Sequence, residues 1–460
     1  MSRLWIFVPA WVFMTASAQG TWAQPTDIEG QVEAEAPPPS IAILQTRIDG
    51  DFPDSDMVAR SIFEVLRQDL LWSQAFVVLD NQDQIDRLAE EDRRSGTVSY
   101  ASWSSLGAHY LVESAVRSHM PDTLEIDLML HDVRDQRIAE GKRTPNCRRS
   151  QLRAAIHRYS DVIVHRCTGK IGIAQTKIAF VNYRPTQRLK EIFLIDYDGW
   201  KESLSQVTQH GSTTLFPAWS PDGQCLAYCS YLDGWPDAFI HYLYKRSGRR
   251  VFPLAQRPGN NLTPTWNPTD PDWLAISLSF KGNPDIYLIR RDGNVVRQLT
   301  TSKAIEEAPS FSPNGQEIVF TSDRSGYPQI YLMSTDGTNV RRLVHMPGYA
   351  CDTAQWSPVP VGGPYGLYKI AFRAYPLGGK RGDIYLINHD GTELINLTED
   401  TYDNSNPSWS PDGQYIAFSS TRAGGKAEIW IMESDGSNPR RLTYVPGQNL
   451  SPAWSPAPGP

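Results

Sequence analysis

Residues 407–413 read Pro-Ser-Trp-Ser-Pro-Asp-Gly, and this stretch decides the fold because its core recurs along the chain. An aromatic residue followed by Ser or Asn and then Pro occurs six times, at intervals of about 45 to 53 residues. The copies are Trp219-Ser220-Pro221, Trp266-Asn267-Pro268, Phe311-Ser312-Pro313, Trp356-Ser357-Pro358, Trp409-Ser410-Pro411 and Trp454-Ser455-Pro456. A regular period of this length indicates a repeat architecture.

Each repeat carries the pattern of four short strands, here named a to d. The aromatic residue ends strand a, and a turn such as Pro411-Asp412-Gly413 leads into strand b. Strand c alternates polar and apolar residues, as in 428–432, and an Asp-Gly turn such as Asp435-Gly436 joins it to strand d. Four strands per repeat predict a propeller blade, and the hairpin turns argue against the competing β-solenoid.

The two ends of the repeat region set the number of blades. Trp454 has no strand b, c or d after it, whereas 177–208 supply b, c and d with no strand a before them. The fragments complete one blade between them, so the sequence predicts a six-bladed propeller. We expect residues from Asn449 onward to pair with the strand at 178–181, which closes the ring and removes exposed sheet edges.

The segment before the repeats alternates strand and helix patterns. Short apolar runs at 41–44 and 76–79 and longer ones at 110–116 and 124–130 predict strands, while 58–70 and 150–166 have helical spacing. No phosphate loop or dinucleotide-binding glycine pattern occurs there. The predicted fold class is therefore an α/β N-terminal domain followed by an all-β six-bladed propeller.

The first residues have the pattern of a secretion signal. Arg3 precedes an apolar stretch at 4–14, which is too short to span a bilayer, and Ala16-Ser17-Ala18 offers a cleavage site before Gln19. We therefore expect periplasmic localisation. The predicted organisation is a signal peptide at 1–18, a disordered acidic and proline-rich tail at 19–40, the α/β domain at 41–172 and the propeller at 173–460.

Composition and motifs disfavour several kinds of chemistry. The formal net charge of −7 and the absence of a clustered basic face argue against nucleic-acid binding. The sequence contains neither an HExxH metal motif nor a Gly-x-Ser-x-Gly elbow, so we expect no catalytic residue, no metal and no cofactor. The spacings of the five cysteines suit neither a zinc site nor the obvious disulfides, so free thiols are expected.

The loops from strand d to the next strand a differ from blade to blade, unlike the turns. Strand alternation places these d–a loops at the mouth of the channel, and variable loops on a rigid scaffold are typical binding sites. Three interpretations stay open: a partner surface, a solvated rim, or an oxygen-rich cation site. The predicted partner-binding residues, here called the rim set, are Thr214, Asn260, Asn261, Thr263, Glu306, Glu307, Asp352, Thr353, Asn404, Asn406 and Asn449.

A secretion signal, a small α/β domain and six such repeats together resemble the TolB family of the periplasmic Tol–Pal system. The stretches that look family-like are Pro217 to Gly223, Ile318 to Asp323, Gly107-Ala108 and Thr168 to Gly172. The resemblance covers the mature chain, and the order of the domains is its most specific feature.

The resemblance implies an adaptor rather than an enzyme. It implies binding of a Pal-type peptidoglycan-associated lipoprotein at the channel mouth and a role in outer-membrane constriction at cell division. It also implies a TolA-type partner bound by an N-terminal segment, although 19–40 matches that segment only faintly, at Asp27-Ile28-Glu29. The alternative is a propeller-bearing envelope lyase or hydrolase acting on glycans or peptides. A metal-dependent lyase needs histidines at the channel, and the parts of the d–a loops at 211–217, 259–264, 304–309, 348–354, 401–407 and 447–452 contain none.

Overall fold

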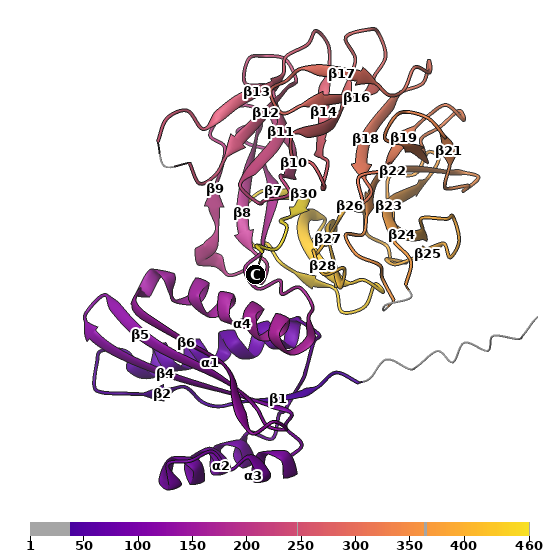
Figure 1. Cartoon of the computed structure of the whole chain (residues 1–460). Helices are drawn as coiled ribbons and strands as arrows, with labels where there is room; N and C mark the ends of the chain where they lie inside the picture. The colour runs from indigo at the N-terminus through magenta and orange to yellow at the C-terminus, as the bar shows by residue number, and fades with distance from the viewer. Residues whose placement is uncertain (1–36, 246, 363–365, 460) are drawn as a thin grey trace, which may run out of the picture. The chain divides into compact units, whose positions relative to one another are not determined.

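The computed structural model describes residues 37–245, 247–362 and 366–459. The expected signal peptide and almost all of the expected tail lie outside these residues. Residues Pro38–Pro460 form one compact unit. It contains a mixed α/β sheet and six four-stranded antiparallel sheets (Figure 1).

The α/β part is a six-stranded sheet with helices packed on it. Its strand order is β3-β1-β4-β5-β6, and β2 pairs with β4. The strands are β1 (Ser40–Ile43), β2 (Arg47–Ile48), β3 (Val77–Val78), β4 (Tyr110–Met120), β5 (Thr123–Asp132) and β6 (Arg137–Arg148). The helices are α1 (Ser55–Trp72), α2 (Gln82–Ser95), α3 (Tyr100–Ser105), η1 (Arg149–Gln151) and α4 (Leu152–Thr168).

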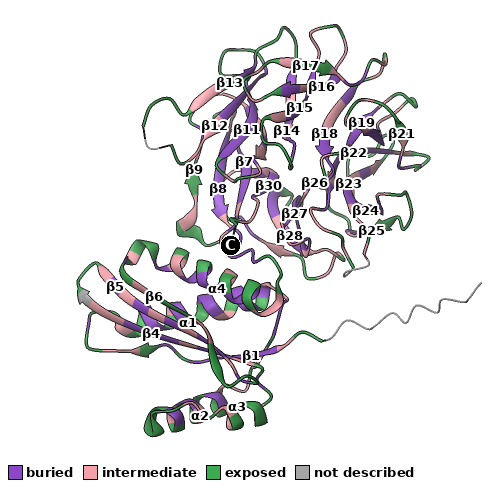
Figure 2. Cartoon of the chain, in the orientation of Figure 1, coloured by how far each residue is buried: buried purple, intermediate pink, exposed green. Residues whose placement is uncertain are grey.

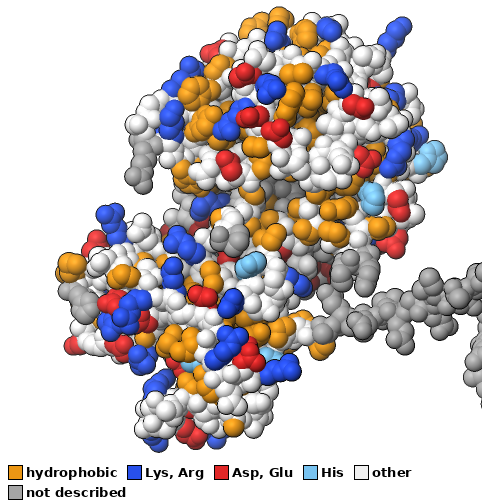
Figure 3. Space-filling model, in the orientation of Figure 1, with side chains coloured by type: hydrophobic (Ala, Val, Ile, Leu, Met, Phe, Trp, Pro, Cys, Tyr) orange, Lys and Arg blue, Asp and Glu red, His pale blue; other side chains and the backbone are white. Residues whose placement is uncertain are grey.

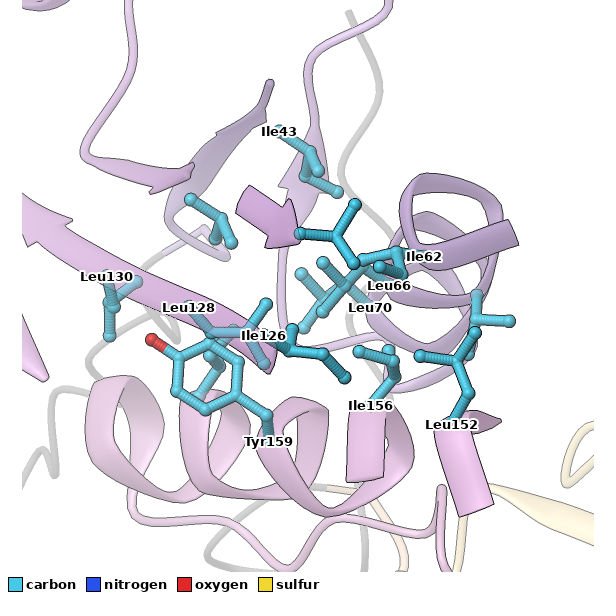
Figure 4. Close-up of a cluster of buried hydrophobic side chains, with 14 of the residues drawn as sticks. Ile43, Ile62, Leu66, Leu70, Ile126, Leu128, Leu130, Leu152, Ile156 and Tyr159 are labelled. Atoms are coloured by element: carbon cyan, nitrogen blue, oxygen red, sulfur yellow. The ribbon is translucent and has the colours of Figure 1, made fainter. Parts of the chain in front are cut away.

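Apolar side chains of α1 and α4 pack against β5 and β1. Figure 4 shows Ile62, Leu66 and Leu70 of α1 gathered with Ile126 and other side chains of the sheet. The helical spacing of the buried positions in α1 explains why this stretch is a helix. Asp54 precedes α1, but it has a left-handed backbone and its side chain makes no capping bond. Gly169 ends α4 in the left-handed conformation, with its N–H donating to the His165 carbonyl.

Six sheets make up the blades, and five of them follow the repeat directly. They are β10 (Thr214–Trp219), β11 (Cys225–Ser230), β12 (Asp237–Tyr242), β13 (Val251–Ala255); β14 (Asn261–Trp266), β15 (Trp273–Leu278), β16 (Asp285–Arg290), β17 (Val295–Gln298); β18 (Glu306–Phe311), β19 (Glu317–Ser322), β20 (Gln329–Ser334), β21 (Arg341–Arg342); β22 (Tyr349–Trp356), β23 (Lys369–Pro376), β24 (Asp383–Asn388), β25 (Ile395–Asn396); and β26 (Asn404–Trp409), β27 (Tyr415–Ala423), β28 (Lys426–Glu433), β29 (Arg440–Arg441).

The sixth blade joins the two ends of the repeat region, which confirms the predicted ring closure. Its strand order is β30-β7-β8-β9. The members are β30 (Gln448–Trp454), β7 (Lys177–Arg184), β8 (Leu189–Asp196) and β9 (Ser205–Gln206), with the short helix η2 (Lys201–Ser203) between the last two. Asn449 lies opposite Asn182, and Trp454 lies opposite Ile178.

The same strands are buried in each blade. The b strands are almost wholly buried, as Figure 2 shows in purple, and the loops at both ends of the blades are largely exposed. The tryptophan Nε1 atoms of several a strands donate to the neighbouring blade, for example Trp266 to the Ala218 carbonyl at 3.2 Å. Trp219 does the same to the Ala453 carbonyl at 3.0 Å. The repeated aromatic residue therefore joins adjacent blades, as packing residues do.

The five cysteines, all among the described residues, are free. Burial raises the pKa of the Cys229 and Cys351 thiols to about 12, which keeps both in the unreactive protonated form. Among the described residues, no helix is both long and apolar enough to cross a membrane.

Candidate functional site

The six a strands surround a hollow of about 310 Å³ along the channel. Residues from every a strand line it, and Thr263, Thr353 and Asn406 of the rim set are among them. Strand direction places the d–a loops at one end of the blades and the a–b and c–d turns at the other. Trp72 of α1 packs at the second end, against Tyr197 and Tyr415.

Each a strand contains one β-bulge that faces the channel. The pairing between strands a and b shifts register in the middle of all six a strands. One non-glycine residue of each strand takes a φ of 49–55°: Phe216, Thr263, Ala308, Thr353, Asn406 and Ser451. This left-handed conformation costs roughly 1–2 kcal/mol for such a residue. Bulges bend their strand and redirect side chains, and strained positions of this kind gather at functional sites.

Five members of the rim set are buried inside the propeller. Thr214, Asn261, Glu306, Asn404 and Asn449 are each 0% exposed. Their side chains bond within the fold, as Asn449 Nδ2 does to Glu428 Oε2 at 2.7 Å. Asn261 Nδ2 likewise donates to the Arg257 carbonyl at 2.8 Å. These side chains tie the start of strand a to neighbouring strands, so we do not include them in a contact surface.

Glu306 differs most from the exposed loop residue that its charge suggested. Its Oε1 accepts from Arg324 at 2.7 Å and from Ser322 at 3.2 Å, and Ser302 also donates to it. The side chain of Arg324 is 26% exposed, and that of Glu306 is 0% exposed. Burial raises the pKa of the adjacent Asp285 to about 6, and the nearby Glu306 carboxylate adds to the shift.

Replacing Glu306 should destabilise the fold. In Glu306→Ala, Arg324, Ser302 and Ser322 lose their shared acceptor, which should cost about 2–4 kcal/mol of unfolding free energy, measured by urea denaturation. Glu307→Ala removes the next carboxylate, which is partly exposed, and should change stability by only about 0.5 kcal/mol. Equal unfolding midpoints for the two variants would contradict the structural role of Glu306.

Six rim residues keep side-chain surface toward solvent: Asn260, Thr263, Glu307, Asp352, Thr353 and Asn406. Two of them are carboxylates in adjacent blades. Burial raises the pKa of Glu307, and the charges of Asp352 and Asp323 raise it further. Burial also raises the pKa of Asp352, against the opposing effect of Arg373. This part of the mouth therefore carries partly desolvated negative charge, which favours a cationic group from outside.

The end of the blades that carries the d–a loops also has exposed apolar side chains, which were not predicted from the sequence. Trp235 is 70% exposed and Leu232 is 44% exposed, both on the b–c loop between β11 and β12. Ile305 and Tyr402 lie on d–a loops and are 44% and 42% exposed. A tryptophan inside a short loop, outside any strand pattern, was the sequence feature that could have identified this surface.

Metal-ligating side chains are scattered in the part of the chain that the structure describes. Among the described residues, no group of three or more His, Cys, Asp or Glu could hold a metal ion. His157 Nδ1 and Asp69 Oδ2 lie 2.9 Å apart, but both residues are buried and Tyr197 covers them. This pair therefore has no route to a substrate.

Two family models match the chain. The TolB amino-terminal domain matches residues 27–139, and the TolB beta propeller domain matches residues 164–360 and 369–459. These matches cover strands β1 to β5 of the α/β sheet and all six blades.

Curated relatives and a solved structure agree with the family models. A Tol-Pal system protein TolB from Desulfosudis oleivorans is 35% identical over 244 residues, 53% of each chain. A protein TolB homolog from Chlorobium chlorochromatii is 32% identical over 285 residues, 62% of each. The matched region thus spans only about half to three-fifths of these relatives.

The crystal structure of TolB from Acinetobacter baumannii superposes with a TM-score of 0.71 at 26% identity. The match covers 91% of this chain and 97% of that one. The domain order, the closed six-bladed ring and both family models lead to one conclusion: the chain belongs to the TolB family.

Proposed function

We propose that the chain is a non-enzymatic adaptor of a Tol–Pal-like system in the periplasm, where its rim binds a Pal-type lipoprotein and supports outer-membrane integrity and constriction at cell division. The observation that carries the proposal is the set of six solvent-facing rim residues around the channel mouth. They come from four blades and include amide, hydroxyl and carboxylate side chains, whereas buried members of the rim set such as Asn261 and Asn449 form hydrogen bonds within the fold. A surface built this way is suited to one specific partner.

The chemistry of the rim suits a protein partner better than a small molecule. Exposed Trp235, Leu232 and Ile305 offer apolar contacts near the polar mouth. Interfaces of this kind typically have a few aromatic anchors surrounded by polar groups. Glu307 and Asp352 add charge complementarity toward a basic group of the partner.

Membership of the TolB family supports the partner class. A relative that bears the name Tol-Pal system protein is 35% identical over its matched region. A TolA-type contact through residues 19–40 is a separate proposal, which the family resemblance alone supports. The periplasmic location rests on the pattern of residues 1–18.

Glu307→Lys tests the rim. The change removes a carboxylate that faces Asp352, so the unfolding midpoint should be kept or raised. Reversing a charge in a desolvated contact should weaken binding of the Pal-type lipoprotein by roughly tenfold or more. Isothermal titration calorimetry with the lipoprotein's soluble domain measures this effect.

Glu202→Lys is the matched control. Glu202 is exposed on η2, at the opposite end of the blades, and its reversal should leave the affinity unchanged. Wild-type affinity in Glu307→Lys, or loss of affinity in Glu202→Lys alone, would contradict a partner site at the rim.

A further inference from the structure

The c–d turn between β12 and β13 differs from those of the other five blades. The others carry Asp-Gly at 198–199, 292–293, 336–337, 390–391 and 435–436. Here the sequence reads Leu243-Tyr244-Lys245-Arg246-Ser247-Gly248-Arg249-Arg250 and contains no Asp-Gly pair. We refer to Tyr244, Lys245, Arg249 and Arg250, which are all exposed, as the basic hairpin.

An aromatic pair supports the cations of the hairpin. The ring centroids of Tyr242 and Phe252 lie 5.5 Å apart in an edge-to-face arrangement. Lys245 Nζ is 5.1 Å from the Phe252 ring, and the Arg249 guanidinium is 5.4 Å from it. Arg291 of the next blade lies 5.1 Å over the Tyr242 ring. Cation–π contacts of this kind hold charged groups in place without neutralising them.

Arg291 interacts electrostatically with the nearby Asp222 carboxylate, so the excess positive charge of this region lies on the basic hairpin. Within the part of the chain that the structure describes, Lys245, Arg249, Arg250 and Arg291 form no ion pair with a carboxylate. The carboxylate of the neighbouring turn, Asp292, accepts from the backbone and side chain of Asn294. The chain as a whole carries a net charge of −7, so this hairpin is an unneutralised basic surface on an acidic protein.

The hairpin also has apolar character at its tip. Tyr244 is 55% exposed. Arg249 and Arg250 border a surface hollow of about 450 Å³ that is lined by Leu232, Val251 and Pro253 and, at its other side, by polar groups that include Asp233. Figure 3 shows Lys and Arg side chains next to apolar ones over the region of β12 and β13.

We propose that the basic hairpin binds the surface of a bilayer that contains anionic phospholipid. Exposed tyrosine beside lysine and arginine is the combination favoured at the boundary between headgroups and acyl chains. A turn at the outer edge of a blade also suits a flat surface, whereas an acidic peptide alone would not account for the exposed Tyr244. Each basic residue near such a surface contributes attraction that salt weakens.

The basic hairpin and the rim set share no residue. Leu232, which borders the hollow beside the hairpin, lies on a b–c loop at the rim end of the blades, so the two sites are distinguished by separate variants. Loss of lipid binding and loss of lipoprotein binding can therefore be measured separately.

Flotation of the full mature chain with lipid vesicles tests the proposal. Vesicles of phosphatidylcholine with about one-third phosphatidylglycerol should bind the protein, and pure phosphatidylcholine should not. The variant Lys245→Ala/Arg249→Ala/Arg250→Ala should reduce binding roughly a hundredfold, since each charge contributes about fivefold. Tyr244→Ala should reduce it several-fold, and high salt should abolish it.

The matched control is Lys380→Ala/Arg381→Ala/Lys426→Ala, which removes the same charge from exposed positions in or beside b–c loops. It should bind vesicles like the wild type, as should Glu307→Lys. Absence of vesicle binding, equal binding to neutral vesicles, or an equal loss in the control would overturn the proposal. Hairpin-dependent capture of poly-glutamate without vesicle binding would also overturn it, in favour of an acidic polypeptide.

Discussion

Removing residues 449–460 is expected to lower the thermal unfolding midpoint by more than about 10 °C. These residues form nearly all of β30, the innermost strand of the split blade. Trp454 is 6% exposed in a cluster with Tyr415 and Ile178, and its Nε1 donates to Thr176 Oγ1 at 2.9 Å. Losing this burial should cost on the order of 5 kcal/mol, a large part of a typical domain's stability.

A shorter truncation provides the control. Removing only residues 457–460 leaves β30 complete, so its midpoint should match that of the full chain. Differential scanning calorimetry measures both. If the two truncated chains had the same unfolding midpoint, pairing between the ends of the repeat region would not be what stabilises the closed ring.

The blades could be predicted from sequence because each strand pattern occurs several times and each copy supports the others. The α/β part had no such repetition, and β2, α2, α3 and β6 were missed. Helix α2 has only Ile85, Ala89 and Asp92 buried in its fourteen residues, so its helical apolar spacing is weak. Strand β6 is an edge strand with one buried residue, Cys147, and lacks the alternation that marks a half-buried strand.

The rim set shows a second limit of prediction from sequence. Thr214, Asn261, Glu306, Asn404 and Asn449 all stand five positions before the aromatic residue of their repeat. That constant spacing indicates a repeated structural role, and the structure shows these side chains buried. Polarity alone could not separate them from Asn260 or Glu307, because a buried polar group and a binding group use the same residue types. Position within the repeat was the better guide.

Contacts between the α/β part and the split blade could not be predicted, because they join residues far apart in sequence. Asp69 of α1 accepts from His157 Nδ1 at 2.9 Å and from the Tyr197 hydroxyl at 2.6 Å. All three residues are buried: Asp69 and His157 are 3% exposed and Tyr197 is 0% exposed. No local pattern around any of them marks this network.

Asp69→Ala is expected to cost about 3–5 kcal/mol of unfolding free energy, because His157 and Tyr197 would lose their common acceptor in a buried site. Since the network joins α4 to the residue that follows β8, the variant should also separate the melting of the α/β part from that of the propeller. Calorimetry that resolves two transitions would show this. Glu64→Ala, at an exposed position of α1, should change stability by only about 0.5 kcal/mol.

The same network predicts a pH dependence whose sign follows from His157. Burial lowers the pKa of His157, but the hydrogen bond and charge of Asp69 outweigh it, so the pKa is raised above its ordinary 6.5. The folded state then holds this proton more tightly than the unfolded chain. Its stabilising contribution is complete below about pH 6.5 and is lost as pH rises through the raised folded pKa. Asp69→Asn should flatten that decline in unfolding midpoints measured from about pH 6 to pH 9. If the unfolding midpoint of Asp69→Asn declined with pH as steeply as that of the wild type, the decline would come from a titratable group other than His157.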